Sequence, residues 1–251
     1  MAGDFDNNGK TDLLFNGYID YYPTNALCSR VCLVILDMGK DSFQIKELTL
    51  STIELLVAKT LMIDGRPYIQ TLKIQDEYNA ELKKNVLRKT VNTLAYVFNS
   101  FIERSTLHDY AIQQVKYCVD PAMIGFDGFT MTISADSIIL MAGKSRIPEC
   151  ATDSGGRYAV KLDPRVQIRI FGILNYINFP DLKNEYTVNA DDDLDGYIQV
   201  VYNNGEIKRI HDYGRIGTFG LKVLQDAFFE LRKTQPWTRT GPGEPFVHCH
   251  N

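Results

Sequence analysis

The most specific candidate for chemistry is an acidic loop near the start of the chain, Asp4-Phe5-Asp6-Asn7-Asn8-Gly9-Lys10-Thr11-Asp12. Side-chain oxygens fall at loop positions 1, 3, 5 and 9, and the backbone carbonyl of Lys10 stands at position 7. Calcium takes about 6–8 oxygen ligands, and alternate residues of a tight loop can turn their oxygens toward one cation. The sequence therefore predicts one calcium site, with the ligands Asp4, Asp6, Asn8, Lys10 and Asp12. The alternative is a solvated acidic turn close to a terminus.

This loop differs from an EF-hand, because position 12 is Phe15 rather than a bidentate glutamate. It resembles the calcium loop of FG-GAP and VCBS repeats, whose pattern Asp-x-Asp-x-Asn/Asp-Gly-x-x-Asp continues into a buried strand, as Leu13-Leu14-Phe15 does here. No second copy follows, so the resemblance covers about one blade of a propeller. The resemblance implies that calcium is the bound ion.

A second acidic cluster, Asp191-Asp192-Asp193-Leu194-Asp195-Gly196, has the spacing of the first half of an EF-hand loop. Positions 9 and 12 are Gln199 and Tyr202, so the ligand set is incomplete. We interpret this cluster as a solvated turn before a strand.

His211 and Asp212 are the remaining catalytic candidates. Neighbouring residues of a strand point to opposite faces, so these two cannot form an acid–base couple directly. A surface or capping histidine is the default interpretation of His211. We interpret Asp212-Tyr213-Gly214 as a turn, with a ligand groove lined by Asp212, Tyr213 and Arg215 as the alternative.

The chain has five cysteines at irregular spacing, which is not the pattern of a disulfide framework, although one bridge is possible. We interpret most of them as small buried hydrophobic residues. His248-Cys249-His250 offers soft-metal ligands, but adjacent residues in a tail rich in Pro and Gly favour adventitious binding over a designed zinc site.

The elements that must position these residues are mainly strands. Apolar runs at 31–36, 43–50, 53–63, 68–74, 93–98 and 101–103 predict hairpins, and Asp64-Gly65 is a hairpin dipeptide. Residues 75–89 lack a wide apolar stripe, which favours a surface connection or a short helix. Further strands follow from about residue 107, with a helix after Asp163-Pro164 and another over 217–233.

The predicted fold class is α+β. Residues 1–105 form a β-rich segment of antiparallel hairpins, and residues 106–238 form an antiparallel sheet packed by two helices. Residues 239–251 are expected to be a flexible tail.

Residues 107–237 also resemble a family of uncharacterised domains from bacterial envelope and secreted proteins. The matching segments include Leu174-Asn175-Tyr176-Ile177-Asn178-Phe179, Tyr197-Ile198-Gln199-Val200-Val201-Tyr202 and Asp212-Tyr213-Gly214-Arg215-Ile216-Gly217-Thr218. That family often opens on Cys-x-Gly-x-Cys-Pro, of which this chain keeps only Cys118. The resemblance implies an envelope or secreted location and carries no activity.

Composition excludes several classes of protein. The chain has 251 residues, 45% hydrophobic and 23% charged, and a net charge of −4, which argues against nucleic acid as a partner. It contains no apolar run long enough to span a membrane. The first residues are not a signal peptide, and the chain opens abruptly on the acidic loop. Together with the resemblance to envelope proteins, this leads us to expect an extracytoplasmic protein whose targeting segment is absent from this chain.

The function expected from these features is a non-enzymatic, extracytoplasmic calcium-binding protein that acts as a scaffold or holds a protein or glycan. One alternative is a hydrolase of an envelope polymer or glycan, with His211, Asp212 and the cluster 191–195 in a shared cleft. Another alternative is a binding module that neutralises a partner.

Overall fold

The computed structural model describes residues 1–20, 28–49, 55–79, 82–120, 128–134, 137–142, 155–187, 193–242 and 249. The chain divides into two compact units. Unit 1 comprises Met1–Arg104 and Thr218–Gly220, and unit 2 comprises Ser105–Gly217 and Leu221–Asn251. Antiparallel strands dominate and two α-helices accompany them, so the protein is a β-rich α+β fold.

Unit 1 contains two four-stranded antiparallel sheets. The first sheet has the order β1(Ala2–Gly3), β2(Asp12–Asp20), β3(Cys28–Gly39), β4(Ser42–Glu47), and the second has the order β5(Leu55–Ile63), β6(Arg66–Asn79), β7(Lys84–Val97), β8(Ser100–Glu103). Their inward side chains share one core, which includes Leu14, Val34, Leu56, Ile69 and Leu94. Each sheet therefore buries one apolar face against the other, as half-buried antiparallel sheets do.

The β5–β6 hairpin turns at Asp64-Gly65, as predicted. Both residues have positive φ values, 51° and 76°, which a two-residue type I′ turn requires. The prediction of a surface connection or short helix over 75–89 is wrong, because β6 continues to Asn79 and pairs with β7 from Lys84 onward. The side chains of residues 82–89 are mostly exposed, so no buried face imposes an apolar alternation on that part of the sequence.

Unit 2 is built on an eight-stranded sheet with the order β13-β15-β14-β9-β10-β11-β12-β16. The strands are β9(Gln114–Asp120), β10(Phe129–Ile133), β11(Ser137–Ala142), β12(Gly156–Lys161), β13(Glu185–Tyr186), β14(Asp195–Tyr202), β15(Glu206–Tyr213) and β16(Thr238–Pro242). All neighbours are antiparallel except β13 and β15, which are parallel.

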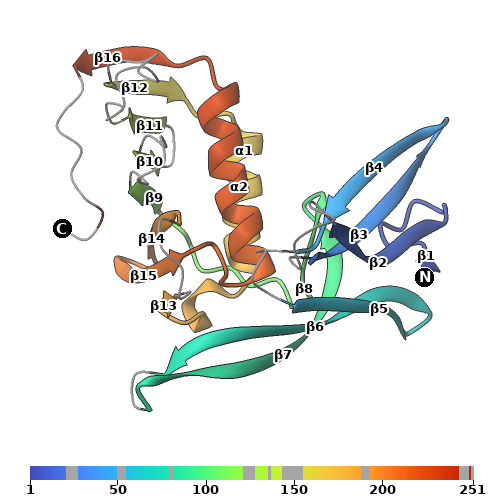
Figure 1. Cartoon of the computed structure of the whole chain (residues 1–251). Coiled ribbons are helices and arrows are strands. Elements are labelled where there is room, and N and C mark those ends of the chain that lie inside the picture. Colours follow the sequence, from blue (N-terminus) through green and yellow to red (C-terminus); the bar gives the residue numbers. More distant parts are fainter. Residues whose placement is uncertain are drawn as a thin grey trace. The chain divides into compact units, whose positions relative to one another are not determined.

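Two helices, α1(Pro164–Tyr176) and α2(Phe219–Thr234), pack on one face of this sheet (Figure 1). Asp163 caps α1 by accepting a hydrogen bond from the Arg165 amide, and Pro164 starts the helix, as predicted. On the covered face the Tyr117 ring meets the Phe228 ring of α2 at a centroid distance of 5.0 Å. A short 3₁₀ helix, η2(Phe179–Asp181), follows α1.

Residues 239–242, which begin the expected flexible tail, belong to a strand. Residues Thr238–Pro242 form β16, which pairs with β12 at the edge of the sheet. Cys249 forms a disulfide with Cys118 of β9, so it is not an unpaired hydrophobic cysteine. Among the described residues, no helix is long and apolar enough to cross a membrane.

Candidate functional site

The acidic loop of unit 1 brings three of its predicted ligands together. One carboxylate oxygen from each of Asp4, Asp6 and Asp12 lies within 4.8 Å of the others. The loop is shaped by its own backbone amides, since Asp4 accepts hydrogen bonds from Asn8 N at 2.9 Å and Gly9 N at 3.0 Å. Gly9 takes φ = 82°, which a residue with a Cβ adopts only with strain. Local hydrogen bonding therefore folds the loop around the carboxylates.

Asp12 anchors this loop to the first sheet. Its side chain is fully buried, and its two oxygens accept hydrogen bonds from Phe5 N at 2.7 Å and Asp37 N at 2.9 Å. These amides satisfy a buried charge that would otherwise be costly. Asp12 thus has a structural role in addition to its place in the cluster.

Asn8 and Lys10 do not join the three carboxylates in the same way. The Asn8 side-chain amide donates to Asp6 Oδ2 at 2.9 Å and to the Asp37 carbonyl at 2.7 Å, and its Oδ1 accepts from Lys10 N at 2.8 Å. A cation that recruited the Asn8 oxygen would replace this last hydrogen bond. The three aspartates are therefore the part of the predicted ligand set that the fold already gathers.

The electrostatics of the cluster favour a cation. Burial raises the pKa of Asp6, and the neighbouring charges of Asp12 and Asp4 raise it further. The pKa of Tyr96 is raised by burial and by the charges of Asp6 and Asp12. A divalent cation would offset this repulsion among the carboxylates.

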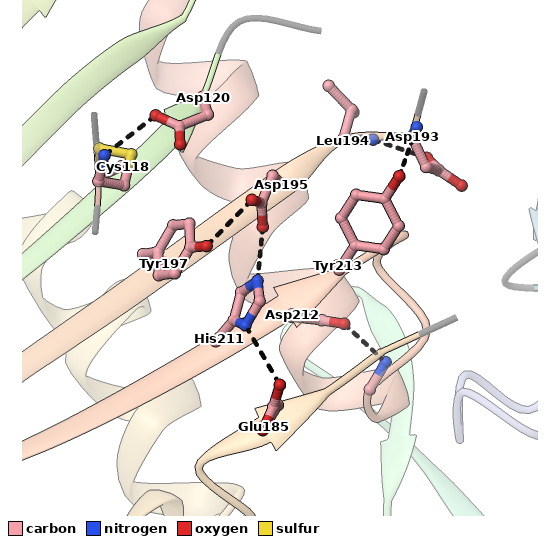
Figure 2. A network of polar contacts seen from close by, with 12 residues as sticks. Cys118, Asp120, Glu185, Asp193, Leu194, Asp195, Tyr197, His211, Asp212 and Tyr213 are labelled. Atoms are coloured by element: carbon pink, nitrogen blue, oxygen red, sulfur yellow. Dashed lines mark hydrogen bonds and ion pairs between the residues drawn. A yellow bond between two sulfur atoms is a disulfide. The ribbon is translucent and has the colours of Figure 1, made fainter. Parts of the chain in front are cut away.

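A second polar site lies on the sheet of unit 2, on the face opposite the helices. The register places Cys118 of β9, Tyr197 of β14, His211 of β15 and Glu185 of β13 in one row across four strands. Figure 2 shows Asp195 beside this row, close to His211 and Tyr197. We call Cys118, Tyr197, His211, Glu185 and Asp195 the polar row.

His211 lies between two carboxylates of the polar row. Its Nε2 is 2.6 Å from Asp195 Oδ1, and its Nδ1 is 3.9 Å from Glu185 Oε1. The Tyr197 hydroxyl donates to Asp195 Oδ2 at 3.0 Å, and its ring stacks on the imidazole at a centroid distance of 4.4 Å. The stacked ring and the carboxylates fix the orientation of the imidazole.

The alternative in which His211 and Asp212 share a cleft is wrong, because these neighbours in β15 point to opposite faces of the sheet, as strand geometry predicts. Asp212 points to the helix-covered face, where its exposed fraction is 1% and its carboxylate accepts from Gln225 of α2 and Gly217 N. Asp212 belongs to β15 rather than to a turn, and it does not line a groove. Asp195 is likewise not a solvated turn residue, because it begins β14 and holds His211.

The disulfide borders the same face of the sheet. Asp120 is two residues beyond Cys118 on β9, and its Oδ1 accepts a hydrogen bond from Cys249 N at 3.0 Å (Figure 2). A cavity of about 850 Å³ extends from Cys118 and Cys249 along the sheet. Its other polar lining residues are Lys116, Asn184, Tyr197, Gln199, Lys208, Arg209 and His211.

Sequence reasoning named His211 and Asp195 separately and missed their pairing. A signal was present, because the hairpin turn at Asn203-Asn204 sets Tyr202 opposite Glu206. Counting outward from that turn puts Tyr197 opposite His211 and Asp195 next to both. No comparable signal joins Cys118 to Cys249, which are 131 residues apart. Asp191, Asp192, His248 and His250 lie outside the described residues.

Residues 126–232 match a family model described as a domain of unknown function (DUF6438). The DUF6438 match lies within the region that resembles uncharacterised domains, and it includes Glu185, Asp195, Tyr197 and His211. It does not reach the acidic loop, Cys118 or Cys249. No curated protein and no solved structure matches the chain.

Proposed function

We propose that this chain is a non-enzymatic, extracytoplasmic binding protein whose N-terminal unit is stabilised by one calcium ion. The observation that carries the proposal is the convergence of the Asp4, Asp6 and Asp12 carboxylates within 4.8 Å. Carboxylate oxygens are the ligands that calcium prefers. The FG-GAP-like order of residues in this loop supports the same ion.

The extracytoplasmic location is supported by the Cys118–Cys249 disulfide. Disulfides persist in oxidising compartments and are rare in the reducing cytosol. The resemblance to bacterial envelope and secreted proteins points to the same side of the membrane. A protein or glycan partner is the binding target that such a location favours.

The calcium site can be tested by calcium titration of the full chain after treatment with a chelator. We expect one calcium per chain by calorimetry and a rise in melting temperature, because the ion binds only the folded loop. The D4A/D6A variant should lose both signals, whereas D109A, which removes an exposed carboxylate of unit 2, should keep them. Absence of binding heat and of any thermal shift in the wild-type protein would rule out the calcium site.

Hydrolysis of an envelope polymer is the second candidate, and the contact of His211 Nε2 with Asp195 Oδ1 at 2.6 Å is the observation that favours it. A carboxylate-oriented imidazole is a common general base. Incubation of the full chain with isolated cell-wall polymer distinguishes the two candidates. Soluble products that the wild type releases and H211A does not would establish a hydrolase, whereas retention without release would support a binding protein.

A further inference from the structure

We propose that Cys118, Asp120 and Cys249 form a thiolate site for zinc when their disulfide is reduced. One ligand atom from each of these residues lies within 4.8 Å of the others; the disulfide joins the two sulfurs, and the Asp120 carboxylate lies beside them. Zinc is held in proteins by cysteine thiolates together with histidine or carboxylate ligands, in a tetrahedral arrangement. Two sulfurs and one carboxylate oxygen supply three of the four positions.

Contacts other than the disulfide bond also place these ligands. Cys118 and Asp120 lie on β9, which is hydrogen-bonded to β14 and β10, so both residues keep their places after reduction. Cys249 is held by the hydrogen bond from its backbone amide to Asp120 Oδ1 at 3.0 Å. A carboxylate accepts on both oxygens, so Asp120 can keep this amide and bind a cation.

The surroundings suit a thiolate ligand. Cys118 and Asp120 are nearly buried, with exposed fractions of 5% and 8%. The Thr130 hydroxyl donates to Cys118 Sγ at 3.3 Å, the kind of outer contact that orients a metal-bound sulfur. The bordering cavity of about 850 Å³ gives a cation and its fourth ligand, water, a path to the site.

The site exists only in the reduced state, because sulfurs bonded to each other carry no thiolate. A dithiol reductant supplies two electrons and two protons, the Cys118–Cys249 bond breaks, and the reductant itself becomes a disulfide. Zinc then replaces the proton of each thiol, and two protons are released to water. Another disulfide then oxidises the pair: it accepts two electrons from the thiolates and two protons from water and becomes a dithiol, while the Cys118–Cys249 bond reforms and the ion is released. The pair is thus a redox-controlled metal site.

Cobalt titration of the full chain tests this site, because a thiolate-to-cobalt charge-transfer band reports sulfur ligands alone. The protein is kept reduced by an excess of a phosphine, because a dithiol would itself bind cobalt through sulfur. We expect one cobalt ion per chain, and we expect the band to disappear when zinc is added. The oxidised protein should show no thiolate-to-cobalt band, because its two sulfurs are bonded to each other. D120N should weaken binding about 10–100-fold, while the exposed-residue control D109N leaves it unchanged.

Cysteine variants show which sulfur atoms bind the cobalt ion. C118S and C249S should each abolish the two-sulfur band under reducing conditions, and circular dichroism compares their folding with that of the reduced wild type. C32A, which removes the buried thiol of unit 1, and D4A/D6A should both keep the band. Failure of the reduced wild type to bind cobalt would overturn the proposal. So would binding that C118S retains and H248A/H250A loses, since that result assigns the ion to the chain end alone.

Discussion

Asp212 and Gln225 form a buried side-chain hydrogen bond between the sheet and α2, with Asp212 Oδ2 accepting from Gln225 Nε2 at 2.9 Å. The other Asp212 oxygen accepts from Gly217 N at 3.1 Å, and Gln225 in turn accepts from Arg215 Nε at 2.9 Å. This network ties β15, the loop after it and α2 together within unit 2. Burial raises the pKa of Asp212 to about 6 despite these hydrogen bonds.

The raised pKa of Asp212 predicts that stability depends on pH. The folded protein holds the Asp212 proton up to a pH of about 6, whereas the unfolded chain releases it near the ordinary value of 3.8. The stabilising contribution is therefore complete below the ordinary value and is lost as the pH rises through about 6. We expect a loss on the order of 2–3 kcal/mol. Urea unfolding of the wild type and D212N at pH values between these limits measures this loss. If the free energy of unfolding changed with pH in the same way in both proteins, the prediction would be wrong.

Calcium binding should depend on pH through Asp6. Its pKa is raised by burial and by Asp12 and Asp4, so a proton competes with the ion at a higher pH than at an isolated aspartate. As the pH is lowered, the affinity for calcium should therefore begin to fall before the pH reaches the range in which ordinary carboxylates titrate. Calorimetric titrations at successive pH values test this expectation. An affinity that stays constant until the ordinary range is reached would show that Asp6 does not ligate the ion.

Reduction of the disulfide should destabilise unit 2 in the absence of metal. The bond joins residues 131 apart, and native bridges of this kind contribute about 2–5 kcal/mol to the free energy of unfolding. The wild type should lose this amount in a reductant that contains a chelator. The C118S/C249S variant should unfold alike with and without reductant, which makes it the control. Equal stability of oxidised and reduced wild type would contradict a structural contribution of the bond.

Gly217 should not tolerate a side chain. A Cβ built there would lie 2.8 Å from Leu221 Cδ1 and 3.0 Å from Asp212 Oδ2, both closer than normal contacts. We expect G217A to cost about 1–3 kcal/mol, the usual range for overpacking. Gly17 is the control position, because a Cβ there meets nothing within 4 Å. Denaturant unfolding measures the free energy of unfolding of G217A and G17A. Equal values would show that the loop after β15 can shift to make room for the added Cβ.

The sequence predicts most elements of this fold because their signals are local. The turn at Asp64-Gly65 and the cap and proline at Asp163-Pro164 each act over a few residues, and the structure has the β5–β6 hairpin and α1 beside them. The ribbon of β6 and β7 differs from the sequence interpretation because the side chains of residues 82–89 are mostly exposed, so no apolar period appears in that part of the sequence.

The candidate sites are also more predictable where their residues are close together in the sequence. Asp4, Asp6 and Asp12 belong to one loop, so their spacing alone suggests that they meet. His211 and Asp195 meet only through the register of a hairpin, and Cys118 and Cys249 meet only through the tertiary fold. Asp212 was assigned to a turn because its burial depends on α2, which the local sequence does not reveal.

Strand β9 lies between β14 and β10, yet it precedes the segment that matches DUF6438. Without β9, no strand would join the hairpin of β14 and β15 to β10 by hydrogen bonds. The helix-covered face of the sheet would also lose Tyr117. The smallest portion able to fold alone must therefore start upstream of the family match. We expect a fragment of residues 126–232 to be unstructured by circular dichroism and a fragment of residues 105–251 to unfold cooperatively. The segment that matches the family model and the fragment that we expect to fold are thus different stretches of one chain.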